Sequence, residues 1–205
     1  MKIIVFGATG GVGKSVVQQG LDAGFEVTAF VRTPTKLNLS HARLTIVQGD
    51  AFNKDQVEKA IEGHDAVVSC LASSNGMKKS TELQEMIGNV VNGMKTHGVK
   101  RIVYTASAGV HNELTGVSGK LIMAMLKNAL VDHRAAVECI QRNELIYTIV
   151  RPMGLTNDPL TGLYRESNTN VPSNAKSISR ADVAHFIIKS LQDEQYFNTS
   201  VGIAS

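Results

Sequence analysis

A short apolar strand runs directly into a glycine-rich turn in the stretch Lys2-Ile3-Ile4-Val5-Phe6-Gly7-Ala8-Thr9-Gly10-Gly11-Val12-Gly13-Lys14-Ser15. The turn has two incompatible interpretations. The spacing Gly7-x-x-Gly10-x-x-Gly13 is typical of a turn that binds the pyrophosphate of a dinucleotide, whereas Ala8-x-x-x-x-Gly13-Lys14-Ser15 is a loose P-loop for a nucleoside triphosphate with magnesium. In both, a phosphate lies on backbone N–H groups at a helix N-terminus, where aligned peptide dipoles favour an anion. The rest of the chain has to distinguish between them.

Short apolar segments alternate with amphipathic segments along almost the whole chain. Consecutive apolar residues, rich in Val and Ile, predict strands buried on both faces at 2–6, 26–31, 43–47, 65–70, 101–105 and 145–150. Helical spacing of apolar residues predicts helices at 12–23, near 57–61, at 83–94, 121–140 and 179–192. Strands that alternate with helices indicate an α/β fold with a doubly wound parallel sheet. We therefore expect a single domain of this class over residues 1–205.

The apolar stripes of these helices are expected to pack on the sheet. Met86, Met94, Met123 and Met125 lie on the stripes, so core packing is the expected role of these side chains. Stripes that are used up in this way favour a monomer.

Composition excludes several classes of protein. The chain has 205 residues, enough for one domain with a substantial core, and its formal charge is only +3. Lys and Arg are spread along the chain, so no nucleic-acid partner is expected. Cys70 and Cys139 are isolated and suit buried thiols in a reducing compartment, and no metal site is expected. The sequence shows no cleavable leader and no membrane-spanning apolar run, so we expect no membrane partner and a cytoplasmic location.

A P-loop needs an acidic residue at the end of an apolar strand to hold magnesium. Asp65 precedes its strand, and the strand at 101–105 is followed by Ala106-Ser107. Asp50 is the one candidate, and a dinucleotide site explains its position equally well. The P-loop interpretation is therefore disfavoured.

The end of the second strand distinguishes between NAD and NADP. An acid at this point bonds the ribose 2′-hydroxyl of NAD, whereas a cation favours the 2′-phosphate of NADP. The strand at 26–31 ends in Arg32, and no acid lies between Glu26 and Asp50. An arginine fork suits a phosphate. The sequence therefore predicts a single NAD(P)-binding Rossmann domain over residues 1–205, with NADP(H) as the cofactor.

Residues 152–178 form a polar stretch interrupted by Pro and Gly, too long for a simple connection. It follows the end of a strand, which is where open α/β sheets place their ligands. Long irregular segments of compact domains are often functional. We expect a substrate-side loop here, and disorder is the alternative.

These features together resemble the atypical short-chain dehydrogenase/reductases, and most of all the biliverdin-IXβ reductase/flavin reductase family. The resemblance runs essentially from end to end. Its more specific segments are Asp132-His133, Asp158-Pro159-Leu160-Thr161-Gly162-Leu163-Tyr164 and Ile178-Ser179-Arg180-Ala181-Asp182-Val183. The segment containing Pro159 to Tyr164 is the most specific of them.

The resemblance implies roles for particular residues. Gly7, Thr9, Gly10, Gly11, Val12 and Gly13 form the pyrophosphate turn, Arg32 and Thr35 take the 2′-phosphate, and Asp50 and Ala51 border the adenine. Leu71, Ala72 and Leu83 line the cofactor groove, and Thr105, His133, Pro152 and Met153 lie on the nicotinamide side. Ser107 matches a serine treated as catalytic in this family. From the residues alone, Ser107 is equally well a turn serine, and His133 either bonds the cofactor side or lies on the surface.

Two departures from related enzymes bear on the substrate. Neither Tyr104 nor Tyr147 has a lysine four residues later, so the Tyr-x-x-x-Lys proton donor is missing, and Gly154 stands where close relatives carry a histidine. Both absences favour acceptors that need little acid catalysis. The predicted function is reduction of a planar acceptor, a flavin, a biliverdin-type tetrapyrrole or a quinone, by NADPH, with the proton from solvent.

Two other functions remain open. A non-catalytic NADP(H) sensor of the NmrA type uses the same fold, and the missing Tyr-Lys pair suits it equally well. A sugar epimerase fits less well, because it normally needs that tyrosine and a second substrate domain.

Overall fold

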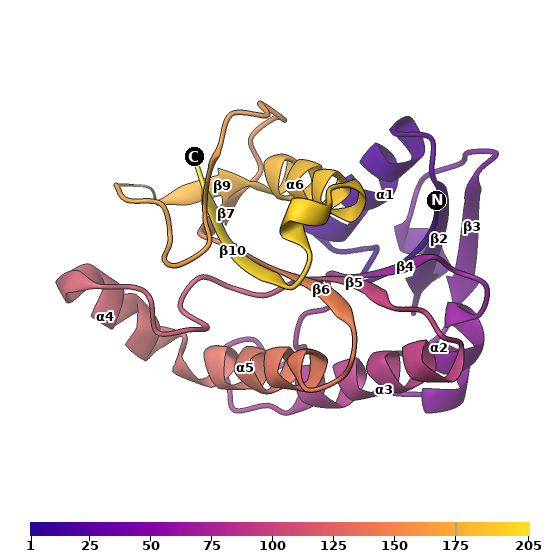
Figure 1. Cartoon of the computed structure of the whole chain (residues 1–205), viewed down its shortest axis with the longest axis horizontal. Coiled ribbons are helices and arrows are strands. Elements are labelled where there is room, and N and C mark those ends of the chain that lie inside the picture. Colours follow the sequence, from indigo (N-terminus) through magenta and orange to yellow (C-terminus); the bar gives the residue numbers. More distant parts are fainter. Residues whose placement is uncertain (175) are drawn as a thin grey trace.

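The computed structural model describes residues 1–174 and 176–205, and one eight-stranded sheet lies at its centre (Figure 1). The strand order is β3-β2-β1-β4-β5-β6-β10-β8, and β7 pairs with β9 in a separate ribbon. All pairs in the large sheet are parallel except β10 with β8. The strands are β1 (Lys2–Phe6), β2 (Glu26–Val31), β3 (Leu44–Gln48), β4 (Ala66–Ser69), β5 (Arg101–Thr105), β6 (Ile146–Pro152), β7 (Gly154–Thr156), β8 (Arg165–Ser167), β9 (Ser177–Ser179) and β10 (Thr199–Ala204).

Helices cover both faces of the sheet, with α1 and α6 on one side and α2, α3 and α5 on the other (Figure 1). The α-helices are α1 (Gly11–Asp22), α2 (Lys54–Ile61), α3 (Glu82–Thr96), α4 (Gly116–Met125), α5 (Lys127–Gln141) and α6 (Arg180–Gln192), and the 3-10 turns are η1 (Pro34–Lys36) and η2 (Glu194–Tyr196). The predicted doubly wound α/β fold is confirmed. Among the described residues, no helix has the length and apolar character needed to span a membrane.

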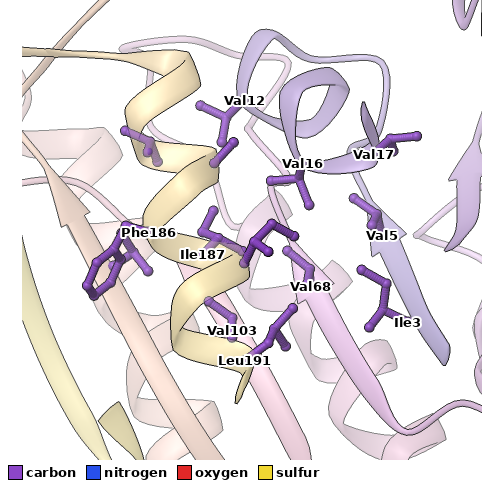
Figure 2. Packing of buried hydrophobic residues seen from close by; sticks show 14 of the residues in the cluster. Ile3, Val5, Val12, Val16, Val17, Val68, Val103, Phe186, Ile187 and Leu191 are labelled. Carbon is purple, nitrogen blue, oxygen red and sulfur yellow. The ribbon is translucent and has the colours of Figure 1, made fainter. Parts of the chain in front are cut away.

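Alternate residues of β1 supply the two cores. Ile3 and Val5 pack toward α1 and α6, while Ile4 and Phe6 face the helices on the other side. Figure 2 shows the first core, in which Ile187 and Leu191 of α6 lie over the strands. Because side chains alternate across a strand, a run of consecutive apolar residues fits only a sheet that is covered on both faces.

The chain order reverses between β1 and β4. β1 pairs with β2 on one side and with β4 on the other, so the segments that leave β1 and β4 diverge at their carboxyl ends. Open α/β sheets bind ligands in the crevice at such a switch point. The glycine turn that follows β1 lies at this position.

The segment predicted as an irregular loop at 152–178 is more ordered than expected. It contains β7, β8 and β9. β8 extends the large sheet by pairing with β10, and the sequence analysis predicted neither of these two strands. β7, β8 and β9 have only three residues each, too few to show a periodic pattern. Residue 175 of this loop lies outside the described residues.

The prediction of one long helix at 121–140 is wrong, because the helix is interrupted at Leu126 and forms two helices, α4 and α5. α4 projects from the body of the molecule (Figure 1), and the exposed fractions of Leu121 and Met125 are 71% and 59%. Core packing is confirmed for Met86 and Met94 but is wrong for Met123 and Met125. Helical spacing locates an apolar face and does not reveal whether that face meets the sheet or an open hollow.

Candidate functional site

Two connected hollows follow the carboxyl ends of the parallel strands. The first, of about 190 Å³, is called the narrow hollow, and it is lined by Gly7, Thr9, Gly10, Phe30, Val31, Arg32, Gly49, Asp50, Ala51, Phe52, Cys70, Leu71, Ala72, Ser74, Glu82 and Met86. The second, of about 680 Å³, is called the wide hollow. It is lined by Gly10, Gly11, Val12, Cys70, Leu71, Ala72, Thr105, Ala106, Ser107, Ala108, Leu114, Ile122, Met125, Leu126, His133, Pro152, Met153, Gly154, Leu155, Lys176 and Arg180. They share Gly10, Cys70, Leu71 and Ala72, so one ligand can extend through both.

The glycine turn packs too closely for side chains. Gly7 has φ +76°, and a Cβ there would lie 2.4 Å from the carbonyl oxygen of Cys70. A Cβ on Gly13 would lie 2.2 Å from the carbonyl oxygen of Gly7. Gly13 lines neither hollow, and its absent side chain lets α1 begin directly against the turn. The backbone N–H groups of the first turn of α1 are therefore open to a ligand.

The two residues that suggested a P-loop lie away from both hollows. Ser15 donates its hydroxyl hydrogen to the carbonyl oxygen of Gly11 at 3.2 Å, inside its own helix. Lys14 is exposed and lines a separate shallow depression. Neither side chain lies where a triphosphate and its metal would be bound.

The narrow hollow brings together the residues expected around an adenosine. Arg32 is exposed at the end of β2, and Asp50 and Ala51 follow β3. Asp50 is held in a turn, since its Oδ1 accepts the N–H of Phe52 at 3.1 Å. Thr35 is exposed on η1 and does not line this hollow.

Leu83 also lies outside the two hollows, in the core on the buried face of α3. Its N–H donates to Oδ2 of Asp132 at 3.2 Å, and the N–H of Gln84 donates to Oδ1 at 3.1 Å. The N-cap residue Thr81 makes no side-chain hydrogen bond. Asp132 therefore caps α3 from a distance and does not contact the groove directly, which explains why a buried carboxylate stands next to His133.

The wide hollow brings together all the residues expected on the nicotinamide side. Thr105 ends β5 and Ser107 follows it, Pro152 ends β6 and Met153 follows it, and His133 reaches in from α5. Ser107 donates its hydroxyl hydrogen to the neighbouring carbonyl of Ala108 at 3.1 Å, which leaves its oxygen lone pairs free. The remaining wall is apolar and is supplied by Leu114, Ile122, Met125, Leu126 and Leu155.

His133 is hydrogen-bonded to Tyr104, a residue that the sequence analysis did not assign to the site. The Tyr104 hydroxyl lies 2.8 Å from Nδ1 of His133. Burial raises the pKa of Tyr104 and lowers the pKa of His133 to about 4, so both groups are neutral near pH 7. When the neutral phenol donates to Nδ1, the ring hydrogen is on Nε2, and His133 is then a hydrogen-bond donor at the wall of the wide hollow.

Charges at the wide hollow are all positive. Lys176 and Arg180 are the charged residues among those described around it. No group of three or more His, Cys, Asp or Glu suited to a metal occurs in the described part of the chain. The surface is therefore suited to an apolar ring with anionic substituents.

The most specific segments of the resemblance hold each other in place. Asp182, in the first turn of α6, accepts the N–H groups of Thr161 and Gly162 at 3.0 and 2.7 Å. The hydroxyl of Tyr164 lies 2.9 Å from Nδ1 of His185. These contacts tie the 158–164 segment to α6, so its role is to shape the loop beside the wide hollow.

A buried ion pair fixes the opposite wall. Arg151 on β6 pairs with Glu113, and both side chains are almost completely buried. Arg151 also donates from Nε to the hydroxyl of Ser200 at 3.0 Å. The pair thereby joins the 106–114 segment, which carries Ser107 and Leu114, to β6 and β10. Sequence reasoning missed it because Glu113 and Arg151 are 38 residues apart.

A glycine turn at the switch point of a doubly wound sheet defines a dinucleotide-binding protein of the Rossmann class. The chain matches the NAD(P)H-binding family over residues 7–194 and belongs to that family. An uncharacterized chloroplastic protein of Arabidopsis thaliana is 32% identical over 206 residues, covering 95% of this chain and 73% of that protein.

Two further similarities concern reductases. Divinyl chlorophyllide a 8-vinyl-reductase of Arabidopsis thaliana is 33% identical over 129 residues, covering 56% of this chain and 31% of that protein. The structure of an anaerobillin reductase from Escherichia coli O157:H7 has a TM-score of 0.79 at 20% identity, covers 98% of this chain and 97% of that one, and shows the shared fold. The chain is thus an NAD(P)H-binding protein of an oxidoreductase-like family.

The residues present fit a nicotinamide dinucleotide. The absence of side chains at Gly7 and Gly13 lets the turn pack closely against its neighbours, and Gly10 and Gly11 line the hollow at the first turn of α1, where backbone N–H groups favour a phosphate. The narrow hollow on one side of the turn has room for the adenosine, and the wide hollow on the other has room for the nicotinamide. The likeness to atypical short-chain dehydrogenase/reductases holds for the fold and for the binding of NAD(P)H. The roles of individual residues stay predictions.

Proposed function

We propose that this protein is an NADPH-dependent reductase of planar conjugated acceptors, of the flavin or biliverdin type. The observation that carries the proposal is the wide hollow, which continues from the dinucleotide groove and has mainly apolar walls. Pockets of this size suit a ligand of two or three fused rings or an open tetrapyrrole. A reductase of a chlorophyllide among the relatives supports an acceptor of this kind.

Arg32 is the reason to propose NADPH in place of NADH. It lines the narrow hollow, and among the described residues it forms no ion pair. A free guanidinium beside the adenosine favours the additional phosphate of NADPH.

When bound, the reduced nicotinamide supplies the hydride. The protein then contributes position and polarity. When its ring hydrogen is on Nε2, His133 is placed to donate to a carbonyl or ring nitrogen of the acceptor, and the oxygen of Ser107 is placed to accept an N–H of the acceptor. With the pKa of His133 lowered to about 4, its imidazolium form is scarce near pH 7, so we assign the proton to solvent.

This assignment favours acceptors whose reduced form needs no strong acid. A flavin takes the hydride at a ring nitrogen and a biliverdin takes it at a conjugated carbon, and in each case charge spreads over the ring system. A simple ketone would leave a localised alkoxide that needs a donor. Cytoplasmic location and a monomeric state stay predictions.

An acceptor screen tests the proposal. FMN, riboflavin, biliverdin isomers and a quinone are each supplied with NADPH or NADH, and the loss of nicotinamide absorbance is followed. We expect turnover with at least one flavin or tetrapyrrole, faster with NADPH, and none with a simple ketone as control. Activity that requires magnesium or ATP would contradict the assignment.

Ser107→Ala is expected to lower kcat about 10-fold, because one hydrogen bond to the reacting groups is lost. The dissociation constant of NADPH should change little, since Ser107 lies beyond the pyrophosphate turn. The matched control is Ser15→Ala, which removes a hydroxyl bonded inside α1. An unchanged kcat in Ser107→Ala would make Ser107 a structural residue.

A further inference from the structure

We infer that Arg180 is a binding residue for the pyrophosphate of the dinucleotide, placed over the N-terminus of α1 from the far end of the chain. The inference rests on NAD(P)H binding, which family membership supports, and is independent of the proposed reductase activity. Neither the glycine turn nor the ribose-site rule points to this residue.

The stem of Arg180 crosses the first residue of α1. A Cβ built on Gly11 would lie 2.4 Å from Cδ and 2.8 Å from Nε of Arg180. A side chain at Gly11 would therefore displace the arginine. The absence of one lets the charged group lie directly against the glycine turn.

The N-terminus of α1 has no anion of its own. Its N-cap residue, Gly10, has no side chain, and the first turn contains no acidic residue. The first N–H groups of a helix have no partner within it and carry partial positive charge. Gly10, Gly11 and Arg180 line the wide hollow together, so the amides and the guanidinium share one open space.

The guanidinium of Arg180 is positioned but not neutralised. Its Nη1 donates to the carbonyl oxygen of Thr156 at 3.1 Å and to Oδ1 of Asn157 at 2.7 Å, and both acceptors are uncharged. Within the described part of the chain, no carboxylate lies at salt-bridge distance from Arg180, and its Nε and Nη2 have no hydrogen-bond acceptor. A fixed arginine with two free donors matches the geometry of a phosphate oxygen pair.

The role of Arg180 differs from that of Arg32. Arg32 lines the narrow hollow, beyond the turn, where the 2′-phosphate of NADPH would lie. Arg180 lines the other hollow, next to the group that NADPH and NADH share. Arg180 should therefore contribute equally to both dinucleotides, whereas Arg32 should discriminate between them.

The test compares three ligands in direct binding titrations of wild type and Arg180→Gln. We expect the dissociation constants of NADPH and NADH to rise by the same factor, about 10-fold, as a charge-assisted hydrogen bond is lost. Adenosine 2′-monophosphate has no pyrophosphate, so its dissociation constant should not change. Circular dichroism and the Tm of each variant report whether the fold is retained.

A second pair of variants leaves Arg180 in place. Asn157→Asp puts a carboxylate next to Nη1 and should weaken NADPH and NADH by a similar factor, because the arginine is then neutralised. Asn157→Ala removes the same anchor without adding charge and is expected to have the smaller effect. This pair keeps the inference testable if Arg180→Gln does not fold.

Three results would overturn the inference. Equal weakening of all three ligands would make Arg180 a structural support of the groove. Unchanged affinity for NADPH and NADH would remove the contact altogether. Weaker binding of FMN but not of riboflavin, measured by flavin fluorescence with NADPH affinity intact, would assign the arginine to a phosphate on the acceptor.

Discussion

Glu113→Ala is expected to destabilise the fold by about 3–5 kcal/mol, because it leaves the guanidinium of Arg151 buried without its counter-ion. Both side chains are nearly inaccessible, at 0% and 3% exposed. Arg151 also donates to the backbone carbonyls of Ser167, Asn170 and Ser200, so it cannot turn toward water without breaking those bonds. The free energy of unfolding from urea denaturation measures the effect.

The matched control is Glu138→Ala, which breaks the exposed pair with Arg142. Pairs of this kind contribute about 1 kcal/mol or less. A loss in Glu113→Ala no larger than in this control would contradict the structural role of the buried pair.

The same pair gives the stability a defined pH dependence. Burial alone would raise the pKa of Glu113, but backbone N–H groups and Arg151 outweigh it, and the pKa is lowered. A lowered pKa in the folded state means that the contribution is complete above the ordinary carboxyl pKa and is lost as the pH falls through the lowered value. Glu113→Ala should therefore flatten the acid limb of the stability curve.

Arg32→Gln is expected to raise the dissociation constant of NADPH about 100-fold, because a guanidinium fork on a phosphate makes two charge-assisted hydrogen bonds. NADH has no 2′-phosphate, so its dissociation constant should change little. The preference for NADPH over NADH should therefore nearly disappear. Fluorescence titration with each reduced cofactor measures both constants.

Arg43→Gln is the control for this change. Arg43 donates to the carbonyl oxygen of Leu21 and lines neither hollow, so its loss alters the net charge equally without touching the groove. We expect it to leave both dissociation constants within about 2-fold, as for a solvent-screened surface charge. Equal losses for NADPH and NADH in Arg32→Gln would remove the NADP assignment.

The sequence predicted the parts of this fold that depend on local patterns. Runs such as Ile3 to Phe6 predict strands covered on both faces, and the spacing of Gly7, Gly10 and Gly13 predicts a turn at the start of a helix. The structure places this turn at the switch point and Arg32 at the end of β2. Each of these features depends on the identity of a few residues that are adjacent in the sequence.

The parts that could not be predicted depend on contacts between distant segments. The bond between Tyr104 and His133, the ion pair between Glu113 and Arg151, and the packing of Arg180 on Gly11 each join residues from different elements. The apolar face of α4 was assigned to the core, because the helical spacing of apolar residues does not show whether that face contacts the sheet or lines a hollow. Asp132 is next to His133 in the sequence, and its carboxylate caps α3, a distant helix.

Multiple-turnover oxidation of NADPH separates a reductase from a dinucleotide sensor with the same fold. The number of NADPH equivalents consumed per protein chain is followed with FMN and with biliverdin, at cofactor concentrations well above the dissociation constant. We predict that many equivalents are consumed with at least one of these acceptors and that the reduced acceptor forms in step. Tight binding of NADPH with no more than one equivalent consumed, whichever flavin, tetrapyrrole or quinone is supplied, would contradict the enzymatic role.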